Sequence, residues 1–142
     1  KKVMYSIEAV RYDGEVAKLK IIKTDKTNDM CLLSFIEQDV LCLSAVDFAE
    51  GLPAQADQLY SIASPLSIFI ENNAMIFSGF YAGINKNDDM VFTIPATYGS
   101  SGAPVFNSHG KLVSILKAAV IKFYVISIGV NLDDIKRFVN NK

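Results

Sequence analysis

A serine between two glycines is the pattern in this chain best suited to chemistry. Residues 99–106 read Gly-Ser-Ser-Gly-Ala-Pro-Val-Phe, so a hydroxyl lies on a tight turn before an apolar strand. Acyl transfer needs a hydroxyl that reaches a carbonyl carbon, and N–H donors that bind the oxyanion formed. Gly99 lets the backbone turn without a clashing Cβ, so its N–H and that of Ser101 can converge. The pattern predicts Ser101 as the nucleophile and the Gly99 and Ser101 amides as an oxyanion hole.

Two other interpretations of this turn were compared with the nucleophile hypothesis. An ordinary Gly/Ser/Pro turn between two strands stays open as an alternative. The nucleophile elbow of α/β-hydrolases needs Gly-x-Ser-x-Gly between a strand and a helix. Ala103 stands where its second glycine would be, and a strand pattern follows, so this interpretation is excluded.

The general base is the missing part of this chemistry. The sequence has a single histidine, His109, in a predicted turn beyond the strand that leaves Ser101. At ~3.3 Å per extended residue, His109 is expected on the order of 15–20 Å from Ser101. A base must come within about 3 Å of the proton, or act through one water. His109 is therefore expected to be a surface residue.

Composition excludes several classes of function. A hydrophobic content of 51% and a charged content of 20% predict a folded domain. The net charge of −1 gives no electrostatic footprint for nucleic acid. No apolar run reaches the ~18–20 residues that span a bilayer. We expect neither a nucleic-acid nor a membrane partner. The opening Lys1-Lys2 and the lack of a visible signal peptide suggest a processed product, a fragment or an incomplete record.

The two cysteines predict no metal site or cofactor. Cys31 and Cys42 form no CxxC motif and have no histidine at metal spacing. Both lie in apolar runs, so they are expected to be small buried hydrophobic residues. A disulfide or a reactive thiol stays open, and so does the compartment.

The elements around the turn are predicted to be almost all strands. Short runs rich in Val, Ile, Phe and Tyr alternate with turn residues such as Asp13-Gly14. Met30–Phe35 is apolar nearly throughout, which is typical of a strand buried on both faces. Further strands are expected at Val3–Val10, Glu15–Lys23, Val40–Ser44, Gln58–Ala63, Ala74–Ala82, Met90–Ile94, Val105–Asn107, Lys111–Ala119 and Lys122–Val130.

A helix is predicted at the end of the sequence alone. Asn131 can cap it, and acidic residues follow in its first turn. Leu132, Ile135 and Val139 share one face. Many short strands and one terminal helix predict a β-barrel or a β-sandwich.

The nucleophile turn and its surroundings resemble the trypsin-like serine peptidases. Gly99–Phe106 followed by Gly110–Ile115 is similar to the family's nucleophile turn, hairpin and substrate-binding strand. Asn28–Leu33 resembles the segment that carries the acid of the catalytic triad. Segments similar to high-temperature-requirement type peptidases are Asp57–Leu66, Met75–Gly83 and Ile126–Val139.

The resemblance implies a fold and a set of site residues. The fold is an all-β, trypsin-like double β-barrel with an incomplete first barrel, plus a C-terminal α-helix. The chain 1–142 would be one peptidase domain lacking its N-terminal part, with residues 1–50 in the first barrel, 55–130 in the second and 131–142 in the helix. Asp29 would orient the catalytic histidine. The strand that pairs with substrate would be Lys117, Ala118 and Ala119. The primary pocket would be lined by Pro95, Ala96 and Thr97, whose lack of charge favours small or apolar side chains.

The chain departs from the family at three positions. Ser100 stands where trypsin has aspartate, so activation by a new N-terminal amine is not expected. Lys117 stands where the family usually has Ser or Thr. It could pair with Asp29, turn outward after a register shift, or serve as the base of a Ser–Lys dyad. The family's histidine would lie on a segment before this sequence.

Two functions from different classes follow from the missing histidine. The first is the C-terminal part of a serine endopeptidase that cleaves a polypeptide substrate. Its histidine would come from a complementing N-terminal fragment, and that fragment or a neighbouring subunit would cover the open first barrel. The alternative is a catalytically inactive peptidase-fold module with a binding or structural role, for example in virion assembly.

Overall fold

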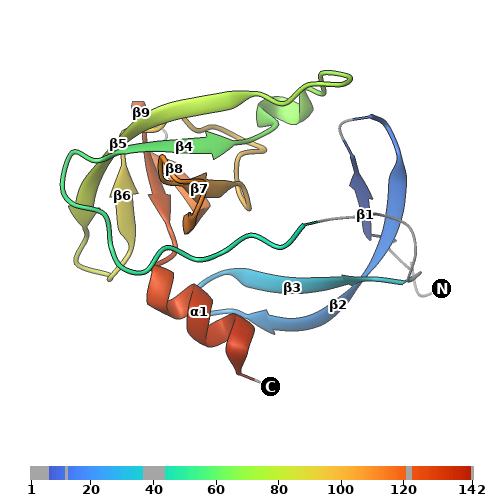
Figure 1. Ribbon diagram of the computed structural model, residues 1–142, viewed down its shortest axis with the longest axis horizontal. Helices are drawn as coiled ribbons and strands as arrows, with labels where there is room; N and C mark the ends of the chain where they lie inside the picture. The colour runs from blue at the N-terminus through green and yellow to red at the C-terminus, as the bar shows by residue number, and fades with distance from the viewer. Residues whose placement is uncertain (1–6, 12, 37–43, 121–122, 142) are drawn as a thin grey trace.

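The computed structural model describes residues 7–11, 13–36, 44–120 and 123–141 (Figure 1). Within them the chain forms strands, one short 3-10 helix and one α-helix. Their bounds are β1 Ile7–Val10, β2 Val16–Asp25, β3 Met30–Phe35, β4 Gln58–Ile62, η1 Pro65–Ser67, β5 Ile76–Ile84, β6 Met90–Phe92, β7 Pro104–Phe106, β8 Leu112–Val120, β9 Phe123–Gly129 and α1 Leu132–Asn140.

The second half of the chain closes into a barrel. Its strands follow the order β4-β5-β6-β9-β8-β7, and each pairs antiparallel with its neighbours. All six barrel strands lie within two residues of their predicted bounds. Closed antiparallel pairing removes free strand edges, which favours a barrel over an open sandwich.

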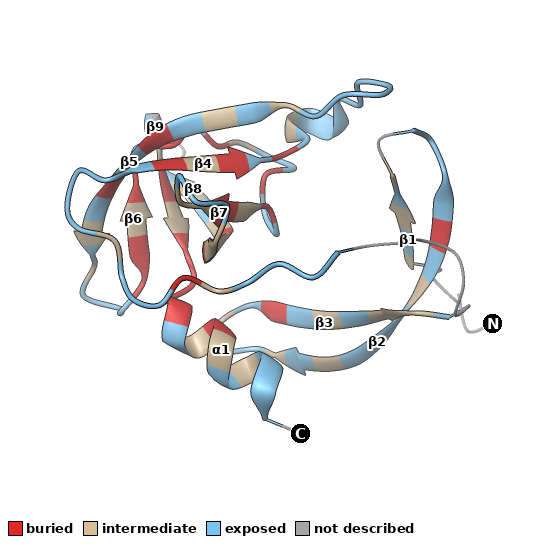
Figure 2. Ribbon diagram, in the orientation of Figure 1, coloured by how far each residue is buried: buried red, intermediate tan, exposed pale blue. Residues whose placement is uncertain are grey.

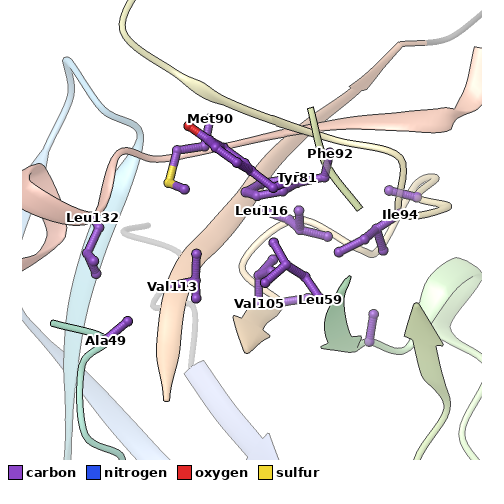
Figure 3. Packing of buried hydrophobic residues seen from close by; sticks show 13 residues of the cluster. Ala49, Leu59, Tyr81, Met90, Phe92, Ile94, Val105, Val113, Leu116 and Leu132 are labelled. Carbon is purple, nitrogen blue, oxygen red and sulfur yellow. The ribbon is translucent and has the colours of Figure 1, made fainter. Parts of the chain in front are cut away.

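The interior of the barrel is filled by apolar side chains from β4, β5, β6, β7 and β8. Leu59, Phe92, Ile94 and Val105 are fully buried, and Tyr81 packs at a tilt on Phe92 with ring centroids 6.1 Å apart (Figure 3). Alternate residues of each strand point to the same face, so this core selects one register for the sheet.

The first half forms an open sheet in the order β1-β2-β3. The predicted Asp13-Gly14 turn joins β1 to β2. Strand β3 has the predicted bounds, but the prediction that it is buried on both faces is wrong, since Cys31 and Leu33 are exposed (Figure 2). A single open sheet does not cover both faces of its edge strand. The incomplete first barrel predicted from the resemblance is confirmed. Parts of two predicted strands, residues 3–6 and 40–43, lie outside the described residues.

Helix α1 begins as predicted. The Asn131 side chain accepts a hydrogen bond from Asp133 N at 3.1 Å. Leu132 and Ile135 are buried, and Val139, near the end of the helix, is 42% exposed.

The helix connects the barrel to the open sheet. Met30 at the start of β3 packs with Val130 and Ile135, and Phe138 is packed against the same cluster. In Figure 1, α1 lies where the ends of β2 and β3 approach the barrel. The sheet is thus fixed to the barrel mainly at its Met30 end.

Candidate active site

The turn between β6 and β7 presents one serine to solvent and buries the other. Ser101 is exposed, whereas Ser100 is 3% exposed. The Ser100 amide donates to Thr97 O at 3.0 Å, and its Oγ accepts from Thr97 N at 3.2 Å. Gly99 and Gly102 flank the pair with φ of +89° and +86°, a region that favours glycine. Ser100 therefore shapes the turn, and Ser101 is the hydroxyl within reach of a substrate.

Two amides of this turn are without an acceptor among the described residues. Gly102 N donates to Leu116 O at 2.7 Å and Ala103 N donates to Ser100 O at 3.1 Å. The N–H groups of Gly99 and Ser101 donate to no acceptor in the described part of the chain. Unpaired amides in the same turn as an exposed hydroxyl can bind a developing oxyanion.

A second loop, formed by residues 64–67, packs against the turn. Leu66 N donates to Tyr98 O at 2.7 Å. A Cβ at Gly99 would lie 3.0 Å from both Leu66 N and Ser64 O. Leu66 and Ser67 have positive φ, 55° and 57°, which is rare for residues with side chains. Loop 64–67 thus supports the Gly99 peptide through main-chain contacts, which sequence analysis missed.

Strand β8 passes beside the nucleophile turn. Ser101 Oγ donates to Lys117 O at 3.4 Å, which is long for a hydroxyl hydrogen bond. Ala118 is exposed and Ala119 is half-buried against the core. The predicted substrate-binding strand therefore runs next to Ser101.

The predicted pocket residues precede the turn directly. Pro95 is exposed, Thr97 is half-buried, and Ala96 is buried in the barrel core. Their role in substrate binding stays a prediction.

Asp29 lies in the turn between β2 and β3. It is exposed, has a φ of +54°, and precedes Met30, which packs against the helix. No hydrogen bond joins it to Ser101 within the described residues. Its role as the orienting acid stays a prediction.

Lys117 does not pair with Asp29. Its Nζ lies 2.5 Å from Asp89 Oδ1, and the two side chains are 21% and 12% exposed. Asp89 was missed by sequence analysis. The available signal was a lysine in an otherwise apolar strand, which needs a carboxylate when it is partly buried.

Neither His109 nor Cys31 forms a hydrogen bond with Ser101 in the described part of the chain. His109 is exposed in the turn between β7 and β8, at the opposite end of β7 from Ser101, as predicted. It lines a groove with Asp47, Glu50 and Asp57, of which Ser101 is not part. Cys31 is a free, exposed thiol, so its predicted burial is wrong; Cys42 lies outside the described residues.

The described part of the chain has neither a candidate metal site nor a membrane-spanning helix. Its histidine, cysteine and acidic side chains form no group of three or more that could hold a metal ion. None of its helices has the length and apolar character needed to cross a membrane.

Comparisons with known proteins concern the fold and the family of the chain. No match was found among the curated proteins. The structure is similar to the crystal structure of the serine endoprotease from Yersinia pestis, with a TM-score of 0.81 and 14% sequence identity. The match covers 97% of this chain but 48% of that protein, so the chain spans about half its length. Residues 3–115 match the model of the trypsin-like peptidase domain. The chain therefore belongs to the family of trypsin-like peptidase domains.

Proposed function

We propose that this chain is the C-terminal part of a serine endopeptidase that cleaves peptide bonds through an acyl-enzyme at Ser101. The observation that carries the proposal is the 99–102 turn. There the exposed hydroxyl of Ser101 lies between two glycines in left-handed conformations. Two N–H groups of the same turn donate to no described acceptor. Membership of the peptidase family supports the same chemistry.

The proposed reaction begins with attack of Ser101 Oγ on the carbonyl carbon of the scissile bond. The hydroxyl proton passes to a histidine base, and the Gly99 and Ser101 amides bind the oxyanion. The C–N bond breaks as the histidine returns the proton to the leaving amine. Water then hydrolyses the serine ester. Asp29 would orient the histidine, which a segment outside this sequence would supply.

The proposed substrate is an extended polypeptide that pairs with β8. The pairing of β7 with β8 reaches Ile115, and Ala118 beyond it is exposed, so we expect this edge of β8 to accept an added strand. Pro95, Ala96 and Thr97 carry no charge. A primary pocket lined by them would accept small or apolar side chains.

We propose that the histidine-bearing segment also covers the sheet β1-β2-β3. Val10, Val16 and Ile21 of this sheet are 57%, 51% and 55% exposed. Proteins normally cover open strand edges and contiguous apolar surface. The same segment would thus complete the first barrel and deliver the base.

The test is to isolate the native protein with every polypeptide that stays bound, and to identify these by mass spectrometry. A fluorophosphonate probe is then applied to the wild type and to variants. We expect a histidine-bearing segment, labelling of the wild type and of Ser100→Ala, and no labelling of Ser101→Ala. Equal labelling of the two variants, or an unlabelled Ser101 in a preparation that holds the histidine segment, would overturn the proposal.

A second candidate function is an inactive peptidase-fold module that binds peptides by strand addition or serves in an assembly such as a virus particle. It is favoured by the position of the sequence's single histidine, His109, at the far end of β7, and by the ion pair that occupies the Lys117 ammonium. Under this function the native protein holds no histidine-bearing segment. Calorimetry would then find the same peptide affinity for the wild type and for Ser101→Ala.

A further inference from the structure

Lys117 is an extra residue in the pairing of β8 with β9. Leu116 lies opposite Gly129 and Ala118 lies opposite Ile128, so Lys117 has no partner residue on β9. A residue inserted in this way forms a β-bulge, which bends the strand and re-aims its side chain. The bulge therefore occurs at the residue whose carbonyl contacts Ser101.

The carboxylate of Asp89, which forms the ion pair with Lys117, is held by hydrogen bonds of its own. Asp89 is 8% exposed and directly precedes β6. Its amide donates to Asn85 Oδ1 at 3.1 Å, and its Oδ2 accepts from Asn85 Nδ2 at 3.3 Å. Asn85 N also donates to Asp89 O at 2.9 Å. These bonds close the turn before β6 and fix the carboxylate independently of β8.

The main chain of Leu116 and Lys117 is hydrogen-bonded to the nucleophile turn. Gly102 N donates to Leu116 O at 2.7 Å, and Leu116 N donates to Ala103 O at 2.9 Å. One residue further along β8, Lys117 O accepts from Ser101 Oγ at 3.4 Å. The Ser101 contact is the longest of these three, so it is the one most sensitive to the orientation of the Lys117 peptide.

We propose that the Lys117–Asp89 ion pair is a positioning device for the Ser101 hydroxyl. The fixed carboxylate holds the Lys117 side chain to one side of β8, and this holds the bulge so that the Lys117 carbonyl faces Ser101. The ammonium acts on Asp89, and the main-chain carbonyl acts on the nucleophile. Lys117 is thus a positioning residue and not a base.

The partial burial of both side chains makes this pair more consequential than a surface salt bridge. Removing one partner of a buried pair leaves an uncompensated charge, whereas removing both does not. Lys111 and Asp47 form a matched control near the start of β8, with a distance of 2.6 Å and side chains 43% and 76% exposed. Exposed pairs of this kind contribute little.

The inference rests on the proposed function, and its test separates the two. The inactivation rate and apparent affinity of a fluorophosphonate probe are measured on the native, histidine-complemented protein. We expect Lys117→Met and Asp89→Asn to lower the inactivation rate by ten- to a hundredfold, the size that a small misplacement of a reacting group causes. Probe affinity should stay unchanged. Lys117→Arg should restore the rate, and Lys111→Met should not change it.

Amide NMR spectra provide a readout that needs no activity. We expect the resonances of residues 99–102 to shift in Lys117→Met and to stay in place in Lys111→Met. If a single variant does not fold, the double variant Lys117→Met/Asp89→Asn removes both charges and is measured in its place. An unlabelled wild type whose turn resonances respond to Lys117 would contradict the proposed function alone. The wild-type inactivation rate in Lys117→Met or Asp89→Asn, or unmoved turn resonances in Lys117→Met, would overturn the positioning role.

Discussion

Substitution of Gly99 by alanine tests two constraints on the nucleophile turn: the left-handed backbone conformation and the close packing of loop 64–67. Gly102 provides a matched control, because it has the same conformation without that packing. The two glycines have nearly equal φ, +89° and +86°. An alanine at either position is held in a conformation that costs about 1–3 kcal/mol. Their surroundings differ. A Cβ at position 102 meets nothing within 4 Å, whereas a Cβ at position 99 lies 3.0 Å from Leu66 N and from Ser64 O.

The contacts at position 99 are with main-chain atoms, which cannot turn aside as a flexible side chain would. Leu66 N is also the donor of the 2.7 Å hydrogen bond to Tyr98 O. Relief of the clash would therefore move loop 64–67 away from the turn and weaken that bond. Overpacking of this kind costs about 1–3 kcal/mol. We expect Gly102→Ala to lower the free energy of unfolding by the conformational term, and Gly99→Ala by about 1–3 kcal/mol more.

The assay is urea unfolding followed by far-UV circular dichroism, since the chain has no tryptophan for fluorescence. Both variants must keep the wild-type dependence on urea, so that the comparison reports on the folded state. An equal loss in the two variants would refute the packing of loop 64–67 on Gly99. No loss in Gly102→Ala would refute the left-handed conformation of the turn.

Three further predictions concern the barrel, the helix and the open sheet. Ser114→Ala removes a buried 2.7 Å hydrogen bond to a main-chain carbonyl, so urea unfolding should give a free energy lower by about 1–3 kcal/mol. Ser127→Ala removes a buried hydroxyl with no partner among the described residues and should raise it by up to about 1 kcal/mol; the reverse order would contradict the hydrogen bonding described. Asn131→Ala should cost about 1 kcal/mol through the lost helix cap, and Asn131→Gly only a few tenths, by the same unfolding measurement. Hydrogen bonds from Arg11 lower the pKa of Asp13 to about 2. The stabilisation they give is thus present above the ordinary value of 3.8 and is lost as the pH falls toward 2. Carboxyl NMR titration should find this pKa, and Arg11→Gln should raise it.

The strands of the barrel were predictable because their signals are local. Turn residues bound each apolar run, and alternation along β4 and β8 needs no knowledge of the partner strand. The exposure of Cys31 and Leu33 was not predictable in this way. An apolar run indicates a strand, but what covers its second face is a property of the tertiary structure.

The candidate site likewise has parts that local sequence signals predict and parts that depend on the tertiary structure. The left-handed turn follows from Gly99 and Gly102, which stand three residues apart in the pattern. Loop 64–67 acts through main-chain atoms, and such contacts have no signature in the side chains. Lys117 indicated the need for a carboxylate, but several acidic residues could have supplied it. Asp89 is selected when β6, β9 and β8 pair in the closed barrel.

The two halves of the proposed site differ in how firmly the described residues fix them. Ser101 and the two unpaired amides belong to a turn that is bonded to loop 64–67, to Thr97 and to β8, all of them on the barrel side. Asp29 belongs to the open sheet and is tied to the barrel through its neighbour Met30. The 99–102 turn is therefore held in place by the barrel itself, whereas the position of Asp29 depends on how the first sheet is completed. Under the proposed function, the segment that brings the histidine would thus also fix the acid that orients it.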